Sequence, residues 1–425
     1  MVHWLQSAAA RHPDRVALVD GGVDVTYAEL TRRAQSAMDA LVAQGVGGGD
    51  RVALALPAGA DFVAALHGCW YAGAVAVPID LRLSAEERAI RTAGAAVIVE
   101  RPLSGQSRCA SHIALEPESV ATVIHTSGTI AAPRPVELTY GNWLWSVLGS
   151  AVALGLDENE RWLCPMPLVH VAGLSIPIRS AIYGTTAVLL ERFEVDQVLA
   201  LLADPEQRIT LVSLVPTMLA RLLDAGLRAP PNLRWVLIGG SPIAPPLLER
   251  ARAARVPVAP TYGMTEACSQ IATNGWPLPG VDVELAGDGE ILVRGPTVAR
   301  TALASDGWLH TGDLGALDEL GRLTIIGRKA DTIISGGENV APAEVEAALL
   351  GHPAVADAAV HARPDPEWGE AVIATVVVRG GLAVDPEALR GHCAARLAPF
   401  KVPKEIEFAD RLPRTASGKL IRSRL

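Results

Sequence analysis

The chain has 425 residues, half of them hydrophobic but only 4% aromatic, and its formal net charge is −9. This length allows two or three hydrophobic cores and excludes a single small domain. The negative charge argues against a general nucleic-acid surface, and no apolar run approaches the ~20 residues that a membrane-spanning helix needs.

The cysteines and the N-terminus indicate the compartment. The five cysteines are scattered and form no CxxC pair, so buried thiols are expected rather than a disulfide framework or a zinc site. No basic segment followed by an apolar one begins the chain, so no signal peptide is expected. The sequence predicts a cytoplasmic protein. It does not fix the oligomeric state, and a homodimer is compatible with it.

The N-terminal part alternates short strands and helices. Thr26 with Glu29 three residues later predicts a capping box at the start of one helix. The expected strands cover 16–20, 51–56, 74–79 and 96–100, and the expected helices cover 2–10, 26–45, 61–72 and the residues after Ser84. This alternation indicates an α/β fold with a doubly wound, largely parallel sheet. Residues 102–117 are expected to form a loop with one short strand.

A glycine- and hydroxyl-rich segment follows the apolar strand that begins at Ala121. The segment Thr126-Ser127-Gly128-Thr129 is succeeded by a proline-containing loop and another strand at 136–138. Backbone N–H groups and small hydroxyls at such a place can approach phosphate oxygens closely. Taken alone, the segment is more often an ordinary Ser/Thr-rich turn.

The middle of the chain continues the alternation. The expected strands are 161–165, 186–190, 210–215 and 236–238, and the expected helices are 142–154, 175–183, 195–203 and 216–225. His170 follows the first of these strands, where a lone histidine is more often structural than catalytic. Gly239 and Gly240 follow the last strand, and two glycines at a strand end allow a flat ligand to approach the backbone.

Residues 261–266, with the sequence TYGMTE, form the most specific short motif. The face of Tyr262 can stack on adenine, and the hydroxyl of Thr265 can bind an α-phosphate. The carboxylate of Glu266 is a hard oxygen ligand suited to Mg²⁺ beside a triphosphate. A capped helix start would explain single residues of this motif, but not the whole string beside the other motifs.

Residues 310–339 combine a carboxylate, a guanidinium and a glycine turn in one short span. A Thr311-Gly312-Asp313 turn precedes a hairpin signal at 318–321, a strand then leads to Arg328, and a second apolar run ends in Ser335-Gly336-Gly337. An ordinary β-meander with charged turns is the simplest interpretation of each piece, but their order and spacing disfavour it.

Short strands at 281–284 and 290–294 predict a smaller β-rich region before this span. Beyond Arg328 the pattern predicts a compact α+β domain, with helices at 342–350 and 386–397 and strands at 355–361, 371–378 and 405–408. The chain closes with PRTASGK at 413–419 and six further residues. A lysine so near a C-terminus is normally only a solvated charge.

Together these motifs resemble those of the adenylate-forming superfamily: acyl- and aryl-CoA ligases, peptide-synthetase adenylation domains and luciferases. The resemblance covers nearly the whole chain. It implies an ATP- and acid-binding domain at 1–328, and a mobile C-terminal domain at 329–425 that carries a catalytic lysine. Residues 267–271 and 136–146 further resemble the o-succinylbenzoate–CoA ligases of menaquinone biosynthesis.

The resemblance also implies roles for individual residues. Asp313 and Arg328 would bind the ribose hydroxyls of ATP, and Lys419 would act in adenylation. His170 would lie at the acyl pocket and gate the thiol channel. The loop residues implied for the β- and γ-phosphates are Thr126, Ser127, Gly128, Thr129 and Arg134. The other implied ligand-binding or catalytic residues are Gly240, Ser241, Tyr262, Gly263, Met264, Thr265, Glu266, Gly336 and Gly337.

Two segments depart from the superfamily pattern. The phosphate loop usually reads TSGTTGxPKG, whereas this chain has Ile130, Ala131, Arg134 and Pro135 at four of its positions. The loop should therefore be stiffer and have one hydroxyl fewer. At the hinge, Ala330 stands where Asp or Lys is usual, between Lys329 and Asp331, so the sequence does not fix which residue bends.

The implied reaction is a two-step ligation that uses ATP, Mg²⁺ and coenzyme A, with o-succinylbenzoate as the implied acid. Arg179 and Ser241 are candidates for binding the second carboxylate of that acid. Three alternatives stay open: a CoA ligase for another acid, a stand-alone enzyme that loads a carrier protein, and a nucleotide-binding protein with little catalysis.

Overall fold

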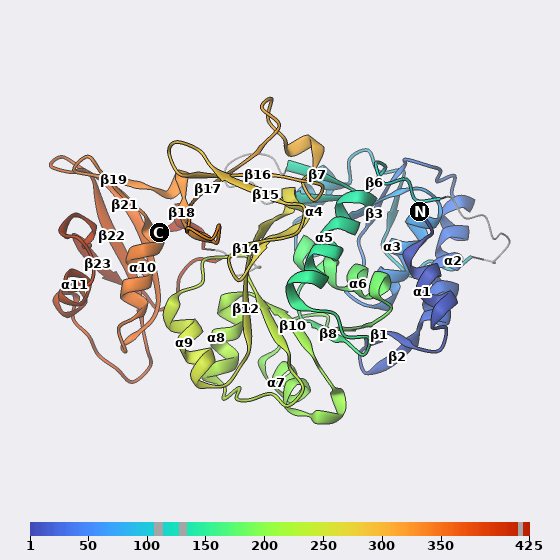
Figure 1. Ribbon diagram of the computed structural model, residues 1–425, viewed down its shortest axis with the longest axis horizontal. Helices are drawn as coiled ribbons and strands as arrows, with labels where there is room; N and C mark the ends of the chain where they lie inside the picture. The colour runs from blue at the N-terminus through green and yellow to red at the C-terminus, as the bar shows by residue number, and fades with distance from the viewer. Residues whose placement is uncertain (106–113, 127–133, 415–419) are drawn as a thin grey trace.

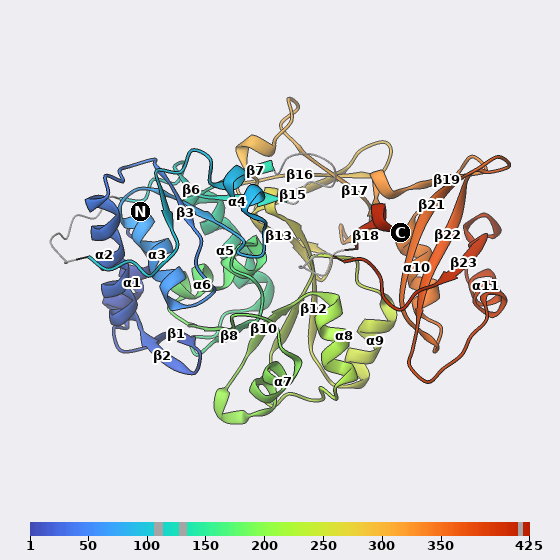
Figure 2. The same cartoon turned by 180° about the vertical axis from the view of Figure 1, so that it is seen from behind.

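The computed structural model describes residues 1–105, 114–126, 134–414 and 420–425. Two views from opposite sides place the N-terminal helices at one end of the molecule and the last elements of the chain at the other (Figures 1 and 2). A small sheet, formed by strands within residues 282–328, lies between them along one side. The site described below forms where this small sheet meets the large N-terminal sheets.

The largest sheet has nine strands, and its central strands, from β12 to β1, run parallel. Leu163 and Val212 face one core while Trp162 and Leu211 face another, because side chains alternate along a strand. In spatial order the strands are β14 Trp276–Pro277, β13 Ser269–Thr273, β12 Val258–Met264, β11 Trp235–Ile238, β10 Leu211–Leu214, β8 Arg161–Cys164, β9 Thr186–Leu189, β1 Val16–Asp20 and β2 Val23–Thr26.

A second sheet of five strands contains three parallel pairings and one antiparallel hairpin, β6–β7. In spatial order its strands are β5 Val97–Val99, β3 Arg51–Leu54, β4 Val75–Pro78, β6 Val120–Thr126 and β7 Arg134–Thr139. One hydrophobic core includes residues of both sheets and of the helices between them, such as Phe62 and Trp143. The helices of this part are α1 Trp4–Arg11, α2 Tyr27–Ala43, α3 Ala60–Tyr71, α4 Ala85–Thr92, α5 Tyr140–Leu154, α6 Val171–Tyr183, α7 Val195–Ala203, α8 Pro216–Asp224 and α9 Pro245–Ala253.

The third sheet is an antiparallel meander of β15 Asp282–Leu285, β16 Glu290–Arg294, β17 Leu309–Leu317 and β18 Leu323–Arg328. The fourth belongs to the C-terminal domain, where α10 Pro342–Leu350 and α11 Pro386–Ala394 share one core with the strands. Its strands are β19 Ile333–Ser335, β20 Glu338–Val340, β21 Val355–Asp365, β22 Gly369–Val378 and β23 Glu405–Phe408. The single-turn 3₁₀ helices are η1 Pro205–Gln207, η2 Thr265–Ala267, η3 Arg300–Ala302, η4 Lys329–Asp331, η5 Pro399–Lys401 and η6 Arg422–Arg424.

The predicted α/β class, with a large N-terminal domain and a smaller C-terminal domain, is confirmed. Two local predictions need correction. The helix predicted at 175–183 begins at Val171, despite Pro177 inside it. The Thr26 hydroxyl accepts the Glu29 N–H, but the Glu29 carboxylate binds Arg33 instead of closing the capping box. The one short strand predicted within the 102–117 loop stays a prediction, because residues 106–113 lie outside the described residues and the described ends of the loop contain no strand.

The prediction of buried thiols is confirmed for the cysteines that the structure describes. Cys69, Cys164, Cys268 and Cys393 are buried free thiols, while Cys109 lies outside the described residues. No helix in the described ranges is both long enough and apolar enough to cross a bilayer.

Candidate functional site

The centre of the site is the buried carboxylate of Asp313, with a residue exposure of 7%. Its Oδ2 accepts a hydrogen bond from Tyr262 Oη at 2.9 Å, and its Oδ1 accepts one from Arg328 Nε at 3.0 Å. Burial and the adjacent Asp313 charge raise the pKa of Tyr262, so its hydroxyl stays protonated and donates. Each carboxylate oxygen keeps a further lone pair for another donor.

The sequence predicted a turn at Thr311–Asp313, and this prediction is wrong. These residues lie inside β17, next to irregularities in its pairing with β16 and β18. Gly312 has φ +69°, which a glycine adopts without strain, and it redirects the chain so that Asp313 points inward. Because Asp313 pairs with Arg328 in register, the β17–β18 hairpin itself brings the carboxylate and the guanidinium together.

The TYGMTE motif forms the end of β12 and the single turn η2, and β12 pairs antiparallel with β13. Cys268 and Ser269 follow with φ +51° and +94°, so the chain reverses tightly. This reversal lays the Ser269 carbonyl over Gly263, where an added Cβ would lie 1.6 Å from the Ser269 oxygen. Gly263 is therefore required by the hairpin, whatever contact it also makes with a ligand.

Replacing Gly263 by alanine should open this hairpin. We expect a loss of at least about 3 kcal/mol in the free energy of unfolding, since no flexible side chain can move out of the way. Denaturant unfolding measures it. The matched control is Gly287→Ala, where an added Cβ meets nothing within 4 Å. Equal stability of the two variants would contradict the close packing of Gly263 on Ser269.

Glu266 has the chemistry of a Mg²⁺ ligand. Its side chain is half-buried, and the described part of the chain gives its carboxylate no hydrogen-bond or ion-pair partner. No cluster of three metal-binding side chains occurs in the ranges that the structure describes. Mg²⁺ commonly binds through one or two carboxylates plus substrate phosphates and waters, so a single free carboxylate fits a metal that arrives with a triphosphate.

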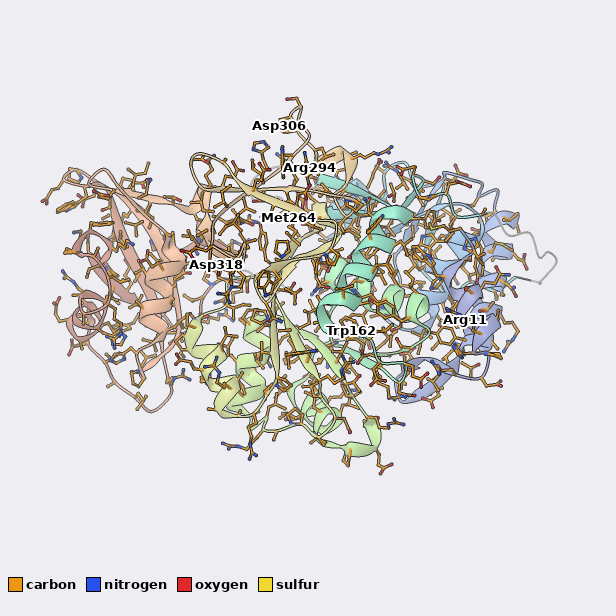
Figure 3. All side chains as sticks on the ribbon, in the orientation of Figure 1. Arg11, Trp162, Met264, Arg294, Asp306 and Asp318 are labelled. Atoms are coloured by element: carbon orange, nitrogen blue, oxygen red, sulfur yellow. The ribbon has the colours of Figure 1, made fainter. Side chains whose placement is uncertain are left out.

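The segment after β11 lies beside the TYGMTE strand. β11 pairs parallel with β12, and an added Cβ on Gly239 would lie 2.6 Å from the Thr261 carbonyl. Gly240 has φ +82°, so this turn also needs a glycine. Ser241 follows directly. The structure thus brings the predicted 239–241 and 261–266 segments together, and Met264 lies near the middle of the molecule (Figure 3).

His170 lies directly before α6, and its carbonyl accepts the Leu174 N–H at 2.9 Å. Burial holds the pKa of its half-buried imidazole below the ordinary value, with the Asp80 carboxylate opposing this effect. The ring is therefore neutral near pH 7.

Arg179 is also on α6, but its exposure is only 1% and it donates to Gln270 Oε1 at 2.8 Å. Burial accordingly lowers the pKa of its guanidinium. Its hydrogen bond to Gln270 holds it against β13, and its burial disfavours it as the carboxylate-binding candidate.

Two predicted groups lie largely outside the described residues. Ser127, Gly128 and Thr129 of the phosphate loop are not described, but the loop's ends pair in the β6–β7 hairpin, with the Thr126 hydroxyl donating to the Arg134 carbonyl at 3.4 Å. Lys419 is likewise outside the described residues. These residues keep their predicted roles as predictions.

Gly336 and Gly337 form the turn between β19 and β20, with φ +60° and +84°. The Gly336 N–H donates to the Trp368 carbonyl at 2.8 Å, and a Cβ on Gly336 would lie 3.0 Å from the Trp368 ring. Among the described residues, no hydrogen bond or ion pair joins this turn to Asp313 or Tyr262. The backbone of this turn requires glycine at both positions, while its role beside the nucleotide-binding residues stays a prediction.

Sequence inspection missed several ion pairs around the Lys329–Asp331 segment. Lys329 contacts Asp288 and Glu290 of the third sheet, while Asp331 accepts a hydrogen bond from Arg422 Nε at 3.0 Å. Arg422 also donates to Glu346 on α10 and to the Val360 carbonyl. No local sequence pattern predicts ion pairs between residues this far apart in the chain. Only Glu290, an acidic residue at the start of a buried strand, indicated that a partner was needed.

Comparison with known proteins places these motifs in context. Residues 5–114 and 99–302 match the family model described as AMP-binding enzyme, and residues 344–419 match the AMP-binding enzyme C-terminal domain. A curated 2-succinylbenzoate–CoA ligase from Bacillus licheniformis is 39% identical over 476 residues, covering 100% of this chain and 99% of that protein.

Two solved structures of o-succinylbenzoate coenzyme A synthetase from Bacillus subtilis are similar throughout. One is in complex with the acyl-adenylate intermediate, with TM-score 0.91 and 36% identity over 100% of this chain and 97% of that chain. The other is in complex with ATP and magnesium ion, with TM-score 0.91 and 36% identity over 100% and 99%.

Proposed function

The chain belongs to the family of AMP-binding enzymes, as an AMP-forming acid–CoA ligase, and from this premise we propose that it joins 2-succinylbenzoate to coenzyme A. The observation that carries the proposal is the buried Asp313 with its Tyr262 and Arg328 donors, because Tyr262 belongs to the same TYGMTE motif as Glu266. The substrate rests on relatives that span the whole chain.

In the first step a carboxylate oxygen of the acid attacks the α-phosphorus of ATP, and pyrophosphate leaves. We assign the ribose hydroxyls to the free lone pairs of Asp313, because Arg328 and Tyr262 already hold this carboxylate in place. Glu266 would hold Mg²⁺, which neutralises charge on the phosphates. Thr126, Arg134 and Lys419 would stabilise the charge that develops during transfer. Catalysis is then positioning and electrostatics, with no protein nucleophile.

In the second step the thiol of coenzyme A attacks the acyl carbon, AMP leaves, and the thiol proton is released. Neutral His170 would lie at the acyl pocket. We propose that the domain 329–425 rotates between the steps, removing Lys419 and bringing the Gly336-Gly337 turn to the site. The ion pairs support a hinge within residues 329–331, because Lys329 contacts the third sheet and Asp331 contacts Arg422 of the C-terminal domain.

The test is thioester formation from Mg·ATP, coenzyme A and a panel of acids that includes 2-succinylbenzoate. We expect 2-succinylbenzoate to give the highest kcat/KM. A different preferred acid would refute the substrate, and turnover only with an acyl-carrier protein would refute the acceptor.

We also propose that the enzyme is cytoplasmic, because ATP and coenzyme A are its cosubstrates.

We further propose that the enzyme is a homodimer. Three apolar side chains on one face of α5 give a surface for self-association: Trp145, Leu148 and Val152, with exposed fractions of 44%, 45% and 70%. Analytical ultracentrifugation of the wild type and of Val152→Lys measures the oligomeric state and tests the homodimer. A wild-type monomer at micromolar concentration would contradict it.

A further inference from the structure

Glu290 is a buried carboxylate that the proposed reaction does not use. It begins β16, and its residue exposure is 7%. Oε1 accepts the backbone N–H of Gly312 at 2.9 Å, and Oε2 accepts Lys329 Nζ at 3.1 Å. One side chain therefore connects two segments of the proposed site: the strand irregularity that carries Asp313 and the first residue of the hinge.

The Gly312 contact bears on where Asp313 lies. Gly312 precedes Asp313 directly, and its left-handed backbone turns that residue inward. Its N–H faces a carboxylate, and a hydrogen bond to an ionised acceptor is stronger than a neutral one. Glu290 therefore binds the backbone directly beside the Asp313 carboxylate that meets Tyr262 and Arg328.

The Lys329 contact bears on the charge of Glu290. Burial alone would raise the pKa of Glu290, but the Gly312 N–H and the Lys329 ammonium outweigh it and hold the pKa below the ordinary value. The carboxylate stays ionised at neutral pH, which keeps both contacts strong. His310 approaches the same Oε2 at 3.7 Å, and its other ring nitrogen contacts Asp306.

We propose that Glu290 is a positioning residue that couples the hinge residue Lys329 to the nucleotide-binding carboxylate Asp313. When Lys329 contacts Glu290, the carboxylate is oriented on Gly312, and Asp313 is held ready for the ribose. When the hinge moves Lys329 away, this support weakens. Nucleotide binding and hinge position are thereby linked. The inference rests on the proposed function, because it takes Asp313 as the ribose ligand.

Asp288 provides a matched control within the same cluster. Its carboxylate also contacts Lys329, but its Oδ1 accepts the Glu290 N–H and neither oxygen contacts Gly312. It is half-exposed, so its loss should not disturb the core. If only the contact with Lys329 mattered, and not the link to Asp313, substitutions of Asp288 and of Glu290 would have the same effect on AMP binding.

The experiment is a double-mutant cycle on the dissociation constant for AMP, with Glu290→Gln, Lys329→Met and both together. We expect each single change to weaken AMP binding about tenfold, as for a hydrogen bond to a charged group. The double variant should bind AMP no worse than either single variant, because both act through one contact. Asp288→Asn should bind like the wild type.

Wild-type affinity in Glu290→Gln, additive losses in the cycle, or an equal loss in Asp288→Asn would each overturn the inference. Thermal unfolding checks that every variant is folded. If Glu290→Gln fails to fold, the AMP affinities of Lys329→Met and Asp288→Asn are compared instead, because both residues are half-exposed. A loss in Lys329→Met alone then supports the inference. AMP affinity needs neither acid nor coenzyme A. If the wild type binds AMP but forms no thioester from 2-succinylbenzoate, the proposed substrate is refuted, while the result on Glu290 and AMP binding still stands.

Discussion

Lys419→Ala is expected to slow pyrophosphate release by about 10²–10³-fold, the usual cost of removing one donor that stabilises transition-state charge. The ammonium is a compact point charge that can bridge the attacking carboxylate oxygen and the α-phosphate. Conversion of a preformed acyl-adenylate to the thioester should be much less affected, because the lysine acts in the first step only. Stopped-flow measurement of each half-reaction separates the two effects.

Lys401→Ala is the matched control, because this lysine of the same domain pairs with Glu344 on α10 and has no role in the proposed reaction. It should keep the wild-type rate in both half-reactions. Equal slowing of both half-reactions by Lys419→Ala would contradict the assignment, since it would indicate damage to the domain rather than to one step.

Asp313→Ala is expected to lower kcat/KM for ATP by about 10²-fold or more. The change removes the proposed ribose ligand and leaves Tyr262 Oη and Arg328 Nε without their acceptor. Truncating one partner of a buried, hydrogen-bonded charge pair typically costs about 2–5 kcal/mol. Steady-state kinetics with varied ATP, together with AMP binding, measures the loss.

Two further variants show whether the carboxylate itself matters. Asp313→Asn keeps the size and one acceptor oxygen, so it should fall between the wild type and the alanine variant. Asp318→Ala, in the exposed turn between β17 and β18, loses only its contacts with Arg322 and neighbouring backbone amides and should keep wild-type kinetics. Similar losses at positions 313 and 318 would mean that the hairpin was disturbed rather than the ligand contact.

Much of the fold could be predicted because its elements follow local rules. β1, α7, α10 and β23 have the predicted bounds, since apolar periodicity and flanking Gly, Pro or capping residues mark them. α6 begins earlier than predicted because Pro177 and Gly173 weaken the helical pattern, although Gly173 is what allows the helix to approach the Pro167 carbonyl. The Thr311–Asp313 turn was wrong because a glycine inside a strand can mark an irregularity as well as a turn.

The site was predictable as a set of residue types but not as a set of contacts. The motifs indicated Tyr262, Asp313 and Arg328 separately. That the tyrosine hydroxyl binds the aspartate follows only from the meeting of β12 with β17, which no local pattern encodes. The same holds for Glu290 with Gly312 and for Arg422 with Asp331. Such pairs depend on how sheets assemble, whereas propensity and spacing report only on neighbouring residues.

The most direct measurement of the central claim follows oxygen through the reaction. 2-Succinylbenzoate labelled with ¹⁸O in its carboxylates is turned over with Mg·ATP and coenzyme A, and the products are examined by mass spectrometry. If the carboxylate attacks the α-phosphorus and coenzyme A then cleaves the acyl-adenylate, AMP carries one ¹⁸O and pyrophosphate carries none. Unlabelled AMP, or label in pyrophosphate or inorganic phosphate, would contradict the acyl-adenylate mechanism.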